Sequence, residues 1–96
     1  MPKDKEEVLR KIKANPDVLK RYGVKQLGLF GSFARGEQKT SSDLDFLVEL
    51  EKETFRAYMG LKFFLEDLFG CKVDLVMKDT MKPRLRDMVL REVIYV

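Results

Sequence analysis

Residues 28–50 read GLFGSFARGEQKTSSDLDFLVEL, and this stretch predicts both the centre of the fold and its functional site. The apolar run that leads to Gly31 and Ser32 predicts a strand. Ten residues later, Asp43 and Asp45 open a second apolar run, which predicts a second strand. Because strand residues two apart point to the same face, we expect the two carboxylates to project side by side.

This arrangement suits a metal ion and a phosphate group. Two adjacent carboxylates repel each other, and a fold tolerates them best when a cation lies between them. Gly31 allows the backbone to approach a ligand closely, and Ser32 adds a hydroxyl where a short helix can begin, which suits a phosphate. The alternative is a hairpin-like turn in which the Ser and Asp side chains only cap and solubilise the chain.

The remaining pattern predicts a single domain over residues 1–96 with an α+β fold of the two-layer α/β type. We expect a small mixed sheet with helices packed on one face. Asp4 and Glu7 predict a capping box at the first helix, and Thr54 predicts the cap of the longest one. Periodicity and turn residues predict helices at 4–14, 17–21, 32–36, 51–69 and from Pro83, strands at 24–30, 44–50 and 72–77, and an edge strand or docked tail at 93–96.

The last predicted helix is amphipathic and basic. Pro83 suits its first turn, and Leu85, Met88 and Val89 are expected to form its inner face. Two interpretations of the basic side chains stay open: they contact a nucleotide or an acidic acceptor surface, or they form a solvated face. These side chains are Lys82, Arg84 and Arg86.

Composition excludes several kinds of chemistry. The chain has no histidine, which excludes serine–histidine and cysteine–histidine nucleophiles and histidine-rich zinc sites. The remaining oxygen ligands suit magnesium or manganese. A net charge of +3 does not by itself predict a nucleic-acid partner. With one cysteine, no signal-peptide pattern and no apolar stretch of about 18 residues, we expect a cytoplasmic protein without a membrane span.

The motif also carries a family resemblance. Gly31-Ser32, ten intervening residues and then Asp43-x-Asp45 resemble the signature of the nucleotidyltransferase superfamily that includes DNA polymerase beta. The local runs GSFARGE and SDLDFLV are similar to those of the minimal nucleotidyltransferases, the MNT partners of HEPN toxins. The resemblance extends from about Leu27 to the C-terminus and implies the nucleotidyltransferase fold.

The resemblance implies a role for each site residue. A third carboxylate is required on a neighbouring strand, and Asp74 in the run KVDLVM is the matching position, although it could be an ordinary strand-end carboxylate. Asp43 and Asp45 are implied to bridge two magnesium ions, for which manganese could substitute. Asp74 would complete the site of the ion that activates the attacking hydroxyl. Gly31 and Ser32 are implied to hold the beta- and gamma-phosphates.

Arg35 is implied to contact phosphate, because in resembling families the arginine just after Gly-Ser lies near the nucleotide. The alternative is a solvated residue paired with Glu37.

The implied reaction transfers AMP from ATP to a tyrosine of a cognate HEPN toxin, so that the chain acts as an antitoxin. Two alternatives stay open: a non-catalytic nucleotide-binding antitoxin that acts by contact, and a small-molecule nucleotidyltransferase of the aminoglycoside type. The expected partners are ATP and the toxin rather than nucleic acid or a membrane, and the sequence leaves a homo-oligomer open.

Overall fold

The two strands predicted around the central loop form the middle of the sheet. In the computed structural model, which describes residues 2–96, β1 (Val24–Phe30) and β2 (Leu44–Leu50) pair antiparallel. β3 (Val73–Met77) adds to β2 in parallel, and β4 (Ile94–Tyr95) adds to β1 antiparallel, giving the order β3-β2-β1-β4. The mixed sheet, the central position of β1 and the C-terminal edge strand are therefore confirmed.

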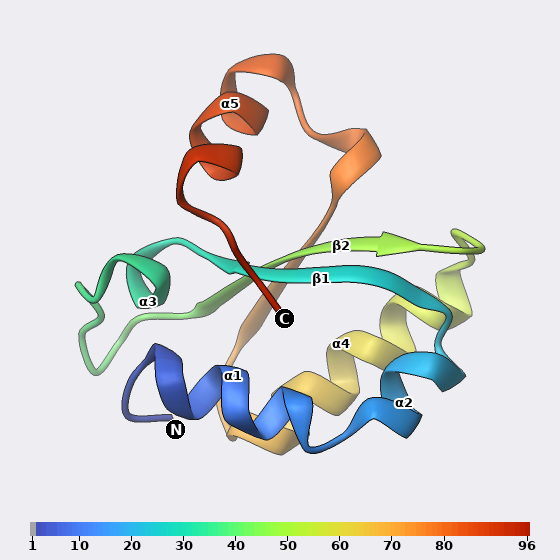
Figure 1. The fold of residues 1–96 in the computed structure, drawn as a ribbon, viewed down its shortest axis with the longest axis horizontal. Coiled ribbons are helices and arrows are strands. Elements are labelled where there is room, and N and C mark those ends of the chain that lie inside the picture. The colour runs from blue at the N-terminus through green and yellow to red at the C-terminus, as the bar shows by residue number, and fades with distance from the viewer. Residues whose placement is uncertain (1) are drawn as a thin grey trace.

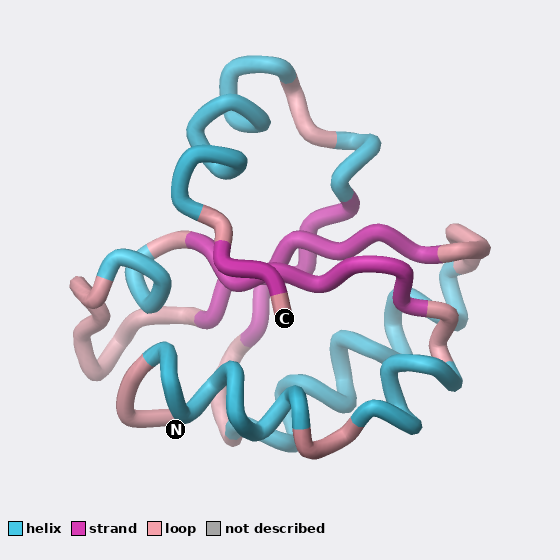
Figure 2. Tube along the Cα trace, in the orientation of Figure 1, coloured by secondary structure: helices cyan, strands magenta, loops and turns pink. Residues whose placement is uncertain are grey.

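Helices cover both faces of this sheet, and one face carries most of them. Figure 1 shows α1, α2 and α4 on one side of the strands and α5 on the other. Figure 2 shows that short loops join most of these elements. No helix within residues 2–96 is long and apolar enough to cross a membrane. The helical bounds are α1 (Lys5–Lys13), α2 (Pro16–Arg21), α3 (Ser32–Arg35), α4 (Phe55–Phe69), a short 3-10 turn (Lys78–Thr80) and α5 (Pro83–Glu92).

Side-chain caps explain where two of the helices begin. The Asp4 carboxylate accepts a hydrogen bond from the Glu7 backbone N–H at 3.0 Å, and the Thr54 hydroxyl accepts one from Ala57 N–H at 3.1 Å. Both predicted caps are confirmed, and such caps contribute about 1 kcal/mol each. The Glu7 carboxylate accepts from the Lys3 N–H, one residue before the cap, so the reciprocal half of the capping box is shifted.

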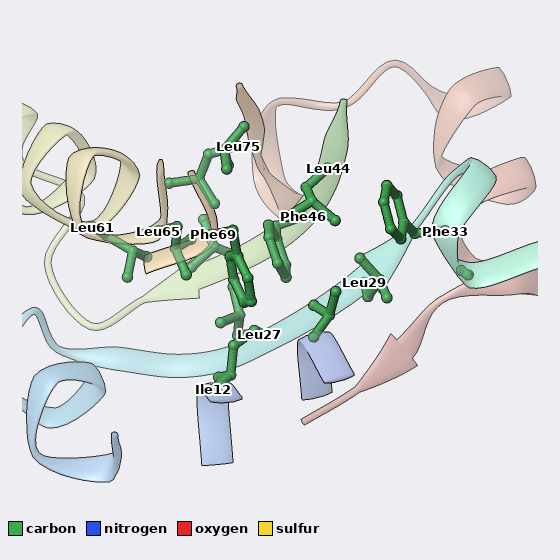
Figure 3. Packing of buried hydrophobic residues seen from close by; sticks show 14 of the residues in the cluster. Ile12, Leu27, Leu29, Phe33, Leu44, Phe46, Leu61, Leu65, Phe69 and Leu75 are labelled. Carbon is green, nitrogen blue, oxygen red and sulfur yellow. The ribbon is translucent and has the colours of Figure 1, made fainter. Parts of the chain in front are cut away.

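The main core lies between the sheet and the α1–α4 side. Alternate strand residues point into it, as the two-residue strand period requires. Phe46 of β2 stacks on Phe69 of α4, with ring centroids 6.2 Å apart (Figure 3). Each fully buried large apolar side chain contributes about 1.5–3 kcal/mol. The labelled members of this core are Ile12, Leu27, Leu29, Phe33, Leu44, Phe46, Leu61, Leu65, Phe69 and Leu75.

The opposite face of the sheet carries a smaller apolar cluster. Leu47 points to this face, whereas its neighbours Phe46 and Val48 point into the main core. The cluster contains Phe30, Leu47, Met81 and Val89. Because so few residues of this face are apolar, much of it is left for polar side chains.

The predicted inner face of the last helix is only partly correct. Val89 is fully buried, but Leu85 and Met88 are 39% and 54% exposed, so their predicted burial is wrong. The periodicity correctly indicated one apolar stripe. However, the cluster beneath α5 is small, and the helix places only Val89 within it.

Candidate active site

Gly31 shapes the turn that joins β1 to α3. Its backbone lies at φ 78° and ψ −156°, a region that is almost restricted to glycine. A Cβ atom at this position would collide with the carboxylate of Asp45. Phe33 of α3 is buried, and Gly36 ends α3 in the left-handed conformation. Glycine is therefore required where the turn meets the carboxylate.

Strand pairing brings two of the predicted carboxylates together. Asp45 lies opposite Phe30 in the antiparallel pair and opposite Asp74 in the parallel pair. Since the flanking residues Leu44 and Phe46 point into the main core, Asp45 projects toward the α5 face. The structure thus brings Asp45, Asp74 and the Gly31 turn to one place.

Asp45 lies in an environment of excess negative charge. Its pKa is raised from 3.8 to about 6, first by burial and then by the charges of Asp74 and Asp43 and a hydrogen bond with Asp74. Arg35 acts in the opposite direction. Asp43, half-buried just before β2, therefore lies close enough to affect Asp45 electrostatically.

Arg35 is held by two carboxylates. Its Nε donates a hydrogen bond to Glu37 at 2.8 Å, which confirms the pairing predicted as one alternative. Its Nη1 donates to Glu92 at 2.7 Å. These bonds, first to Glu37 and then to Glu92, raise the pKa of Arg35. Sequence reasoning missed Glu92, because no local pattern links residues 57 positions apart.

A family model for the nucleotidyltransferase domain matches residues 10–96, a range that contains the Gly31 turn and all three aspartates. The chain belongs to the nucleotidyltransferase family. The predicted resemblance to that superfamily is thereby confirmed.

Three known proteins are similar to this chain. Protein adenylyltransferase MntA of Thermococcus cleftensis is 44% identical over 81 residues, covering 83% of this nucleotidyltransferase and 82% of the relative. A solved minimal nucleotidyltransferase is 41% identical with a TM-score of 0.82, over 96% and 95% of the two chains. The third match is a chain in the structure of the tri-AMPylated Shewanella oneidensis HEPN toxin in complex with MNT antitoxin. It is 19% identical with a TM-score of 0.66, over 92% and 70%, and shows the shared fold.

The donor set of the nucleotidyltransferase fits a hard divalent cation. Carboxylate oxygens are the ligands that magnesium and manganese prefer. The pKa of Asp45 is raised first by burial and then by the negative charges of Asp74 and Asp43, and a cation would offset these charges. Within residues 2–96, no three His, Cys, Asp or Glu side chains lie close enough to hold one ion as they are arranged. A site with three carboxylate ligands therefore requires side-chain rearrangement around the Asp45–Asp74 pair.

Three basic residues lie just before and within the first turn of α5. Lys82, Arg84 and Arg86 are exposed, as the solvated-face alternative predicts. Their contact with a nucleotide or an acidic acceptor remains a prediction.

The raised pKa of Asp45 predicts a pH dependence of folding stability for the metal-free nucleotidyltransferase. Between about pH 4 and about pH 6, folded Asp45 retains a proton that the unfolded chain has released. This contribution to the free energy of unfolding is therefore largest below about pH 4 and is lost as the pH rises through about 6. Urea unfolding in EDTA should show the parent losing stability relative to Asp45→Asn across this window. Asp17→Asn, at an exposed position of α2, is the control, and parallel curves for parent and Asp45→Asn would contradict the assignment.

Proposed function

We propose that this nucleotidyltransferase transfers AMP from ATP to a tyrosine of a HEPN-family toxin and acts as the antitoxin of that toxin. The observation that carries the proposal is the meeting of Asp45, Asp74 and the Gly31 turn at the end of β1. The 44% identity with a protein adenylyltransferase supports AMP transfer to a protein. The shared fold with a chain of the complex that holds a tri-AMPylated HEPN toxin supports the choice of acceptor.

In the proposed reaction, the carboxylates bind the metal ions and the Gly31 turn binds the phosphates. Asp43, Asp45 and Asp74 would hold two magnesium ions, which supply electrostatic stabilisation of the triphosphate and of the attacking oxygen. Gly31 and Ser32 would bind the beta- and gamma-phosphates through the start of α3.

The proposed bond changes concern the α-phosphorus. A bond forms between the tyrosine oxygen and the α-phosphorus, and the bond from this phosphorus to the oxygen that bridges to the β-phosphate breaks, so that pyrophosphate leaves. Asp74 is exposed, so an acceptor can approach it from solvent. Asp74 would accept the proton of the tyrosine hydroxyl, directly or through a water molecule.

We further propose that one domain over residues 1–96 carries this reaction. The proposed compartment is the cytoplasm, which supplies ATP and magnesium. Exposed Asp74 and the neighbouring exposed face of α5 leave room for a protein acceptor.

The proposal is tested by incubating the protein with a HEPN toxin, magnesium and ATP labelled in the α-phosphate. The toxin is expected to gain label and the mass of AMP, because the carboxylates need a divalent cation to hold the triphosphate. Manganese should replace magnesium, and EDTA should abolish the transfer. A toxin with its acceptor tyrosine replaced by phenylalanine is the control. Equal transfer in EDTA would contradict the metal role, and labelling of an aminoglycoside in place of the toxin would favour the small-molecule alternative.

A further inference from the structure

The ion pair between Arg35 and Glu92 joins two segments that are distant in sequence. Arg35 is the last residue of α3, and Glu92 is the last residue of α5, immediately before the connection to β4. Their contact, Nη1 to Oε2, is 2.7 Å long. It links the turn beside Asp45 to the C-terminal part of the chain.

The two carboxylates on Arg35 differ in their exposure to solvent. The Glu92 side chain is 15% exposed, whereas that of Glu37 is 66% exposed. Although the bond to Glu37 makes the larger contribution to the raised pKa of Arg35, water and salt screen an exposed pair strongly. Glu92 is therefore the carboxylate better able to hold the guanidinium in one position.

Glu92 is also the better anchored of the two. Val89, three residues earlier, is fully buried, and Ile94, two residues later, pairs with Leu29 in the sheet. Glu37, in contrast, follows directly after the left-handed Gly36 in an exposed loop. Tight packing on both sides of Glu92 limits the movement of its carboxylate.

Arg35 retains donors for a ligand. A guanidinium carries five N–H donors, and the two carboxylates use one at Nε and one at Nη1. The remaining N–H groups lie on a planar fork of the kind that binds phosphate oxygens well. The backbone N–H of Arg35 donates to the carbonyl of Gly31 at 3.1 Å, so α3 fixes Arg35 beside the turn that contacts Asp45.

We infer that Glu92 is a positioning residue, which holds the guanidinium of Arg35 so that its remaining N–H groups face the triphosphate. The inference rests on the proposed function and extends it with the phosphate contact of Arg35 that the family resemblance implies. Glu92 itself does not contact the nucleotide, and it acts only through Arg35. This assigns a role in nucleotide binding to a residue at the end of α5, outside the Gly-Ser and Asp motifs.

Calorimetry of magnesium–ATP binding tests this inference with a matched pair of variants. Glu92→Gln is expected to weaken binding about fivefold, because a charged hydrogen bond that orients Arg35 is lost. Glu37→Gln removes the exposed carboxylate from the same guanidinium and should change affinity less than about twofold. Arg35→Ala should weaken binding at least as much as Glu92→Gln. In the Arg35→Ala background, Glu92→Gln should have no further effect, because its target is gone.

The outcomes distinguish a failed phosphate role of Arg35 from a failed positioning role of Glu92. If Arg35→Ala leaves affinity unchanged, the phosphate role of Arg35 under the proposed function is wrong, and this inference falls with it. If Arg35→Ala weakens binding but Glu92→Gln does not, only the positioning role is overturned. An equal effect of Glu92→Gln with and without Arg35 would also overturn it, because a purely structural role would be additive. Urea unfolding of each variant checks folding. The Arg35 Nη–H signals in nitrogen-15 NMR should broaden or shift more in Glu92→Ala than in Glu37→Ala, because Nη1 donates to Glu92 and Nε to Glu37.

Discussion

The Asp45→Asn protein is expected to transfer AMP at least about a thousandfold more slowly than the parent, while it folds normally and still binds its toxin. Asparagine keeps the volume of the side chain but removes the charge that would hold the metal ions. Asp45 is the central residue of the proposed site, since it lies between the Gly31 turn and Asp74. The variant should be slightly more stable than the parent at neutral pH, because one of several repelling carboxylates has gone.

Two measurements together decide this prediction. The first is the intact mass of the toxin after incubation with ATP and magnesium, and the second is toxin-dependent growth arrest. Asp17→Asn is the matched control, since it makes the same chemical change at an exposed position of α2. If the Asp45→Asn protein neutralised the toxin fully while the toxin stayed unmodified, the chain would be an antitoxin that acts by contact, and the catalytic proposal would be wrong.

Gly31→Ala should abolish AMP transfer and lower the free energy of unfolding by about 2–4 kcal/mol. Alanine at φ 78° and ψ −156° is strained, and its Cβ would collide with the Asp45 carboxylate. Either the end of β1 or the carboxylate has to move. Both movements displace the residue on which the proposed metal site depends.

Gly36→Ala provides the control for backbone strain alone. Gly36 also has a positive φ, 72°, but a Cβ at this position would meet no atom within 4 Å. Its cost should therefore be about 1–2 kcal/mol, the ordinary penalty for a left-handed residue, with transfer largely retained. Urea unfolding and the transfer assay are measured on both variants. Equal losses of stability and activity at the two positions would show that contact with Asp45 is not what makes Gly31 necessary.

The parts of the site that could be predicted from sequence are those set by local rules. Strand alternation and the break at Gly31 define where β1 ends and where Asp45 projects, and the structure agrees. The position of Asp74 was implied by resemblance, and parallel pairing of β2 and β3 brings it beside Asp45. The predicted roles of Asp43, Ser32 and the metal ions remain proposals.

The features that were missed depend on contacts between distant parts of the chain. Periodicity showed that α5 has an apolar stripe, but it could not show that the sheet face beneath offers cover for Val89 and little for Leu85 or Met88. Likewise, no local rule connects Arg35 with Glu92, because their meeting requires α5 to cross the face of the sheet opposite α4 (Figure 1). Such pairings arise only after the helices have packed.

The edge strand β4 connects the attachment of the sheet edge with the nucleotide site. It contains only two residues, Ile94 and Tyr95, and it pairs with the same strand that leads into the Gly31 turn. Glu92 lies two residues before β4, so separation of this edge from β1 would loosen the carboxylate that holds Arg35. If Glu92 positions Arg35, then occupancy of the nucleotide site and attachment of the sheet edge are thermodynamically coupled, and the coupling is reciprocal. A partner that bound β4 only while the strand is attached to β1 would thereby raise the affinity for nucleotide without touching it.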